Sequence, residues 1–304
     1  MIKLIAVDMD GTLLNSEGRI SRRNAYAVQC LQALGTEFLV CTGRSYEDAL
    51  LPLKERGIRA SVICMNGSCI YDWNGRLADK TVFQTEQVKQ ILRAGKEFGA
   101  VFDFMTSRGS FSISTEEEFR DAYERDILLP MAAYSYEAVR DRFHLVREEE
   151  LFSLGLEFFK ISVLHASSQT LNDLKERLKE IENLAVASSF YTNLELTHKD
   201  AQKGKALAAY ASARGIRLDE IMAIGDSEND TSMLSMGLKY TIAMGNAMES
   251  VKKTAKCLTR TNDEDGVAYA IETLILSQEA RSEDKAAAVF KVVSRKNLTH
   301  TSKQ

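Results

Sequence analysis

Two carboxylates stand directly after an apolar run near the start of the sequence. The run Leu4–Val7 is followed by Asp8 and Asp10, and Gly11 then allows a tight turn. Two close carboxylates cannot both stay ionised in a buried pocket unless a cation offsets them, and hard oxygen ligands suit Mg2+. Asp8 can then attack phosphorus to form an aspartyl-phosphate, while Asp10 protonates the leaving oxygen and later activates water. Taken alone, the segment also fits a strand that ends in an acidic turn.

Two further segments offer groups that could hold a phosphate. Thr42 and Gly43 follow another apolar run, where a hydroxyl beside the start of a helix can hold a phosphate oxygen, although a helix cap is the alternative role. Three lysines lie within 199–205, and a solvated loop is the alternative there. We choose Lys203, because Gly204 follows it and a helix is expected to begin at that point. Its ammonium would offset charge on the nucleophile and on the transferring phosphoryl group.

A fourth polar segment follows the apolar run Ile221–Ile224. Asp226 is expected to be a direct metal ligand, and Asp230, four residues on, is expected in the second coordination shell. Asn229 is positioned to orient the phosphate or Asp8. The alternative is an acidic loop that caps a helix.

The elements that carry these segments alternate between buried strands and amphipathic helices. The segment Ser21–Leu34 has the apolar spacing of one helix face, with Ser21 as its cap, and it lies between the apolar runs Leu4–Val7 and Phe38–Cys41. Strand–helix–strand alternation predicts a parallel sheet with right-handed crossovers. Because ligands of such sheets bind at the carboxyl ends of the strands, we expect all four polar segments to meet at one site.

The length of 304 residues exceeds the size at which one hydrophobic core usually stops growing, so we expect two domains. Residues 1–82 and 189–280 are predicted to form the α/β core. Residues 83–188 mix helices and strands without a run that ends in an acid, which predicts an inserted α+β domain. Residues 281–304 form a basic tail to which we assign no function.

Composition excludes several other classes of protein. A formal net charge of -4 gives no general attraction to nucleic acid or to an anionic membrane. No apolar stretch reaches the roughly 18–20 residues of a membrane span, and acidic residues come too early for a signal peptide. The five cysteines are odd in number and lack CxxC spacing, which indicates reduced thiols without a disulfide framework or a zinc site. We expect a cytoplasmic protein with a small-molecule partner; the sequence does not give its oligomeric state.

The joint motif order resembles the haloacid dehalogenase superfamily, and the resemblance covers about residues 1–277. The motifs that carry it are Asp-x-Asp-Gly-Thr at 8–12, Thr-Gly-Arg at 42–44, Lys-Gly at 203–204 and Gly-Asp-x-x-Asn-Asp at 225–230. Three more segments are similar to Cof-type hydrolases with a type IIB cap, namely Met65–Gly67, Asn246–Ala247 and Asn262–Val267. One departure is His198-Lys199, where the family often has Pro-Lys before its glycine.

The resemblance implies a Rossmann-like core with an inserted α+β cap that reads the leaving group. It implies Mg2+ on Asp8, on the main-chain carbonyl of Asp10 and on Asp226, with Thr42 and Lys203 as phosphate binders. The implied activity is a phosphatase for small phosphate monoesters, with sugar phosphates first and nucleotides, flavin and pyridoxal phosphates as other classes.

Two other functions stay open at this point. A phosphomutase shares the nucleophile and this type of cap, but it returns the phosphate to a second hydroxyl. A non-catalytic sensor of phosphometabolites is the other, and the intact Asp8, Asp10, Lys203 and Asp226 argue against it. In the predicted cap, Asp103, Arg108 and Glu195 are candidates to face the substrate, and the sequence favours none of them.

Overall fold

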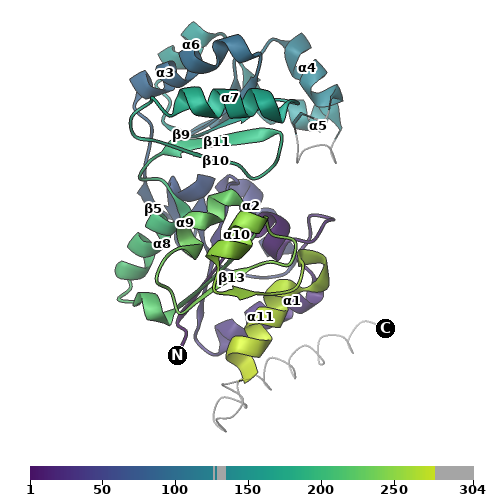
Figure 1. Ribbon diagram of the computed structural model, residues 1–304, viewed down its shortest axis with the longest axis vertical. Helices are drawn as coiled ribbons and strands as arrows, with labels where there is room; N and C mark the ends of the chain where they lie inside the picture. The colour runs from purple at the N-terminus through teal and green to yellow at the C-terminus, as the bar shows by residue number, and fades with distance from the viewer. Residues whose placement is uncertain (126, 129–134, 278–304) are drawn as a thin grey trace. The chain divides into compact units, whose positions relative to one another are not determined.

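The computed structural model describes residues 1–125, 127–128 and 135–277, and the chain divides into two compact units (Figure 1). The first unit holds Met1–Cys64, Ile70–Ala78 and the described residues from Lys203 onward. The second holds the described residues of Met65–Cys69 and Asp79–Gln202. The basic tail, 281–304, lies outside the described residues.

The bounds of the second unit differ from the 83–188 expected for the inserted domain. Strand β11, Asn193–His198, pairs antiparallel with β9, Phe158–Leu164, and also with β10, Leu184–Ala187. These backbone hydrogen bonds keep residues beyond 188 in the second unit. The chain therefore returns to the first unit at Lys203 and not at residue 189.

An eight-stranded sheet forms the centre of the first unit, in the order β14-β13-β12-β1-β2-β3-β4-β5. Its strands are β1 Leu4–Val7, β2 Glu37–Cys41, β3 Ser61–Cys64, β4 Cys69–Tyr71, β5 Leu77–Lys80, β12 Ile221–Gly225, β13 Tyr240–Ala243 and β14 Cys257–Leu258. The six strands from β14 to β3 pair in parallel. Every residue of β1 is buried, as a strand covered on both faces requires.

Helices accompany these strands along the chain of the first unit. They are α1 Arg22–Ala33, α2 Tyr46–Glu55, α8 Lys203–Ser212, α9 Thr231–Leu234, α10 Glu249–Thr254 and α11 Gly266–Ile271. The predicted cap of α1 is confirmed, because the Ser21 side chain accepts a hydrogen bond from the Asn24 N–H. Helix α2 runs through Pro52. Helix α1 packs against α11, and α8 packs against α9 (Figure 1).

The strand order reverses beside β1, and this reversal places the functional site. From β1 the chain proceeds through β2 to β3 in one direction, whereas β12, β13 and β14 follow in the opposite direction. With right-handed crossovers, the connecting helices then lie on opposite faces of the sheet. Ligands of open α/β sheets bind at the carboxyl ends of the strands beside such a reversal.

The second unit is built on a six-stranded sheet in the order β10-β11-β9-β6-β7-β8. Its remaining elements are β6 Val101–Thr106, β7 Gly109–Ser112, β8 Phe143–Leu145, α3 Thr85–Gly95, α4 Glu116–Glu124, α5 Tyr136–Arg140, α6 Glu148–Ser153 and α7 Ser168–Leu178. A core cluster that includes Phe102, Phe104 and Phe158 packs with residues of α3 and α7. A second cluster joins Val101 and Leu164 to residues of α4 and α5. The predicted α+β composition is confirmed.

Candidate active site

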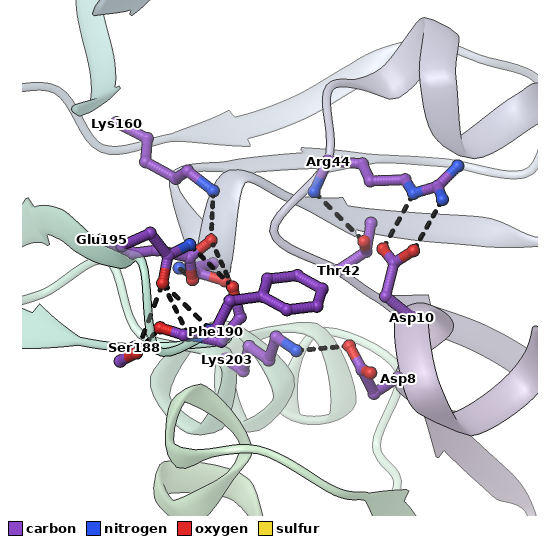
Figure 2. Close-up of polar contacts among 12 residues, drawn as sticks. Asp8, Asp10, Thr42, Arg44, Lys160, Ser188, Phe190, Glu195 and Lys203 are labelled. Carbon is purple, nitrogen blue, oxygen red and sulfur yellow. Dashed lines mark hydrogen bonds and ion pairs between the residues drawn. The ribbon is translucent and has the colours of Figure 1, made fainter. Parts of the chain in front are cut away.

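A buried lysine and two buried aspartates form the centre of the candidate site in the first unit. Asp8 follows β1, and its backbone N–H donates to the Ile224 carbonyl at 3.0 Å, which continues the β1–β12 ladder. Lys203 is the first residue of α8 and is fully buried. Its Nζ lies 2.5 Å from Asp8 Oδ1 and 2.7 Å from Asp230 Oδ1 (Figure 2 shows the contact with Asp8). One ammonium therefore holds two carboxylates from separate segments.

Asp226, at the end of β12, completes a cluster of carboxylates. Oxygens of Asp8, Asp226 and Asp230 lie within 4.8 Å of one another. Thr12 Oγ1 donates to Asp226 Oδ1 at 2.8 Å, and Ser227 Oγ donates to Asp226 Oδ2 at 3.0 Å. These hydrogen bonds fix the direction of the Asp226 carboxylate toward the loop that follows β1.

Burial and like charge raise the pKa values of the carboxyls in this cluster. Burial, followed by the charge of Asp230, raises the pKa of Asp8 well above its usual range. The same two causes raise the pKa of Asp226 to about 6. Burial alone would lower the pKa of Lys203, but the carboxylates of Asp230 and Asp8 raise it, so the ammonium stays charged. The cluster is short of positive charge.

The donor set fits a divalent cation. When all three carboxylates are ionised, one ammonium leaves two negative charges uncompensated, with Asp8 and Asp230 buried and Asp226 half-buried. Carboxylate oxygens are the hard ligands that Mg2+ prefers. Asp230 is the least available of the three, because its Oδ1 accepts from Lys203 and its Oδ2 accepts from the backbone N–H groups of Asp226 and Ser227. Asp8 and Asp226 are the carboxylates best placed to hold the ion.

The Asp10 side chain lies with Arg44 and not with the carboxylate cluster. Arg44 Nε donates to Asp10 Oδ2 at 2.8 Å and Nη2 donates to Oδ1 at 2.6 Å (Figure 2). The Arg44 backbone N–H donates to Thr42 Oγ1 at 3.1 Å. Of the predicted metal-site residues Asp8, Asp10 and Asp226, Asp10 thus has its carboxylate paired with Arg44, and its main-chain carbonyl stays the predicted ligand. Arg44 lies in the Thr-Gly-Arg motif, but its pairing with Asp10 was not predicted from the sequence.

The structure also locates the other two predicted phosphate-site residues, Gly43 and Asn229. Gly43 lies between β2 and α2 and is half-buried. Asn229 is half-buried in the short helical turn Glu228–Asp230, directly after β12. Both follow the carboxyl ends of their strands, as predicted.

The second unit contains its own buried polar cluster. Lys160 Nζ lies 2.7 Å from Glu195 Oε1, and Asn66 Nδ2 donates to Glu195 Oε2 at 2.8 Å. Lys160 and Glu195 are both almost fully buried. Asp103 is buried on a neighbouring strand, and burial raises the pKa of its carboxyl to about 6. Sequence reasoning missed Lys160, although a lysine inside the apolar run Phe158–Leu164 is a signal that it needs a buried partner.

Among the cap candidates named from the sequence, Glu195 is held by these partners and Arg108 donates to the Leu154 carbonyl.

The described residues include no helix that is both long enough and apolar enough to cross a membrane.

Comparison with known proteins identifies the family. The haloacid dehalogenase-like hydrolase family model matches residues 5–271. Phosphatase YwpJ of Bacillus subtilis is 33% identical over 90% of this chain and 100% of its own length. The 5-amino-6-(5-phospho-D-ribitylamino)uracil phosphatase YwtE of the same organism is 32% identical over 92% of this chain and 100% of its own.

Solved structures agree with these relatives. A haloacid dehalogenase-like hydrolase from B. subtilis matches with a TM-score of 0.79 and 31% identity, covering 90% of this chain and 100% of its own. The chain belongs to the haloacid dehalogenase-like hydrolases, of the Cof type, and its activity class is that of a phosphatase. The resemblance noted in the motifs is thereby confirmed.

Proposed function

We propose that this protein hydrolyses small phosphate monoesters, with Mg2+, through an aspartyl-phosphate on Asp8. The observation that carries the proposal is the buried Lys203 ammonium 2.5 Å from Asp8 Oδ1, beside the Asp226 carboxylate. A nucleophilic carboxylate needs a cation that holds it in place and offsets the charge of the incoming phosphoryl group. Lys203 supplies both functions from the start of a helix.

Asp8 and Asp226, with the Asp10 main-chain carbonyl, would hold Mg2+. When bound, the ion would neutralise negative charge on the carboxylates and on the phosphoryl oxygens. Asp230 orients Lys203 and the backbone of the Asp226 loop. Thr42 Oγ1 and Lys203 Nζ contact phosphoryl oxygens, with Gly43 and Asn229 contributing to the same phosphate site.

The reaction proceeds in two steps. In the first, a carboxylate oxygen of Asp8 forms a bond to phosphorus, the bond from phosphorus to the leaving oxygen breaks, and Asp10 gives that oxygen a proton. In the second, water attacks phosphorus and gives a proton to Asp10. The bond from phosphorus to the Asp8 oxygen breaks, and inorganic phosphate leaves.

Sugar phosphates are the substrate class that we propose first. Among the relatives, YwtE is named for a substrate with a phosphorylated ribityl chain, and a matched structure with 25% identity and a TM-score of 0.75 is described as a subclass IIB sugar phosphatase. Selection of the leaving group is assigned to the second unit on the family resemblance. The phosphate site itself lies on residues of the first unit.

Phosphate release from a panel of sugar and nucleotide monophosphates tests the proposal. Wild type and Asp8→Asn are compared with Mg2+ and with chelator, and Asp141→Asn, an exposed aspartate of the second unit, serves as the matched control. We expect release that requires Mg2+, persists in Asp141→Asn and is lost in Asp8→Asn. Release only after a sugar bisphosphate is added would favour the phosphomutase, and binding without release would favour the sensor.

A further inference from the structure

Three asparagine side chains each donate to a backbone carbonyl of the loop that follows Asp8. Asn246 Nδ2 donates to the Gly11 carbonyl at 2.8 Å, Asn24 Nδ2 to the Leu13 carbonyl at 3.3 Å, and Asn262 Nδ2 to the Leu14 carbonyl at 3.0 Å. The donors come from α1, from the loop after β13 and from the turn Asn262–Glu264. Segments far apart in sequence therefore converge on one short loop.

The asparagines also connect these segments to one another. Asn246 Oδ1 accepts from the Asn262 backbone N–H at 2.9 Å, and Asn24 Oδ1 accepts from the Ala268 N–H at 2.9 Å. A side-chain amide both donates and accepts, so each of these two bridges a carbonyl on one segment and an N–H on another. Because a carbonyl can only accept and a backbone N–H can only donate, the orientation of both amides is fixed.

The bond from Asn246 has a direct consequence for the candidate metal site. A trans peptide is planar, so its C=O and N–H point in opposite directions, and holding the Gly11 carbonyl also sets the direction of the Thr12 N–H. The Thr12 side chain donates to Asp226 at 2.8 Å. Gly11, with a φ of 72°, lies so close to Asp226 that an added Cβ would be 2.5 Å from Oδ2. The segment from Gly11 to Thr12 therefore rests on Asp226 on one side and is held by Asn246 on the other.

We propose that Asn246 and Asn262 are positioning residues for the phosphatase reaction, and that they set the distance between the Asp8 loop and Asp226. The proposal rests on the function proposed above. It also gives a role to two sequence motifs, Asn246–Ala247 and Asn262–Val267, that the chemistry of the site does not use. Both residues act through backbone groups and neither contacts the Asp8 or Asp226 carboxylates in these bonds.

Asparagine-to-aspartate changes test this with almost no change in shape. Asn246→Asp keeps the oxygen that accepts from the Asn262 N–H, but it loses the donor and places a carboxylate oxygen against the Gly11 carbonyl. Asn262→Asp does the same at the Leu14 carbonyl. Asn172→Asp, on the exposed face of α7, is the control for the added charge.

We expect kcat to fall about 10- to 100-fold in Asn246→Asp and in Asn262→Asp, with little change in KM for the phosphate ester. The double variant should lose less than the product of the two single losses, because the residues share one network. Mg2+ should raise the thermal midpoint less than in wild type, and the amides of residues 9–14 should exchange hydrogen faster. The midpoint without Mg2+, compared with that of Asn172→Asp, gives the folded fraction by which the rates are corrected.

Two results would overturn the inference. One is wild-type kcat together with wild-type stabilisation by Mg2+ in both single variants. The other is a loss of activity fully accounted for by a fall in the folded fraction, which would make the asparagines structural only. If the wild-type protein itself releases no phosphate, the proposed function fails, while the Mg2+ stabilisation and hydrogen-exchange comparisons still decide whether the asparagines hold the loop.

Discussion

Arg44 donates to both carboxylate oxygens of Asp10, so this carboxylate is paired with Arg44 and does not belong to the cluster of Asp8, Asp226 and Asp230. Both side chains are only partly exposed, Arg44 at 28% and Asp10 at 33% of the side-chain surface. A planar guanidinium that meets a carboxylate with two parallel bonds fixes its position more closely than a lysine would. Arg44, in the loop that follows β2, therefore sets the position of the Asp10 carboxylate, which is the proposed proton donor.

Arg44→Met should slow the hydrolysis of alkyl phosphates by about 10- to 100-fold, because Asp10 is no longer held for proton transfer. Aryl phosphates have leaving groups that need less protonation, so their hydrolysis should slow less. Arg44→Lys should give an intermediate loss. Steady-state kinetics on one alkyl and one aryl phosphate measure the difference, with the exposed Arg22→Met as control. Equal losses on both substrates would count against a role through Asp10.

Lys203→Met should destabilise the chelated protein by about 3–5 kcal/mol, since it leaves buried carboxylates without the ammonium that pairs with them. Urea unfolding in chelator measures this free energy. Lys205→Met, on the exposed side of the same helix, should change it by less than about 1 kcal/mol. Similar losses in the two variants would contradict the assignment of Lys203 as the buried partner of Asp8.

Glu195→Gln should destabilise the protein by about 3 kcal/mol, because it removes the carboxylate charge that lies 2.7 Å from the buried Lys160 ammonium. The Lys80–Glu157 pair in the same unit offers a matched comparison, since both side chains are 42% exposed. Glu157→Gln should change the free energy of unfolding by less than about 1 kcal/mol. Equal changes in the free energy of unfolding for Glu195→Gln and Glu157→Gln would show that burial does not control the strength of the Lys160–Glu195 pair.

Asp103 should make stability depend on pH. Burial raises the pKa of this carboxyl from 3.8 to about 6 in the folded protein, so the folded state binds more protons than the unfolded state between these values. The contribution of Asp103 is therefore most favourable below about pH 4 and is lost as the pH rises through about 6. Asp103→Asn removes this loss, and its advantage over wild type should grow to about 3 kcal/mol above that window.

Urea unfolding of wild type and Asp103→Asn across this pH range checks the prediction, with Asp141→Asn, exposed in the same unit, as the control. An advantage of Asp103→Asn that stays constant with pH would show that the Asp103 carboxyl does not titrate in this range.

Apolar runs followed by turn residues made the central strands predictable. The strands β1, β2 and β12 lie within one residue of the expected runs, because a strand buried on both faces must be continuously apolar. Strand β5 was missed because all four of its residues are exposed and only two of them, Leu77 and Ala78, are apolar. Strand β14 has only two residues, too few for a pattern.

The grouping of the site residues followed from topology, but the directions of their side chains did not. Asp8, Lys203, Asp226 and Asp230 were expected together because the ends of parallel strands share one edge, and the structure brings them together. The choice of Arg44 as the partner of Asp10 depends on how two loops approach each other in space. The buried pair of Lys160 and Glu195 also depends on how segments approach each other in space, because the two residues lie on separate strands and are 35 residues apart in sequence.

The most direct test of the account is to trap the phosphorylated enzyme. The protein is mixed with a labelled phosphate ester and Mg2+, turnover is stopped with acid, and the labelled peptide is identified by mass spectrometry. We predict one phosphoryl group on Asp8 in wild type and none in Asp8→Asn. With an aryl phosphate, whose leaving oxygen needs little protonation, Asp10→Asn should carry more of it, because water is no longer activated. Phosphate release by Asp8→Asn at the wild-type rate, or a label on any other residue, would contradict it.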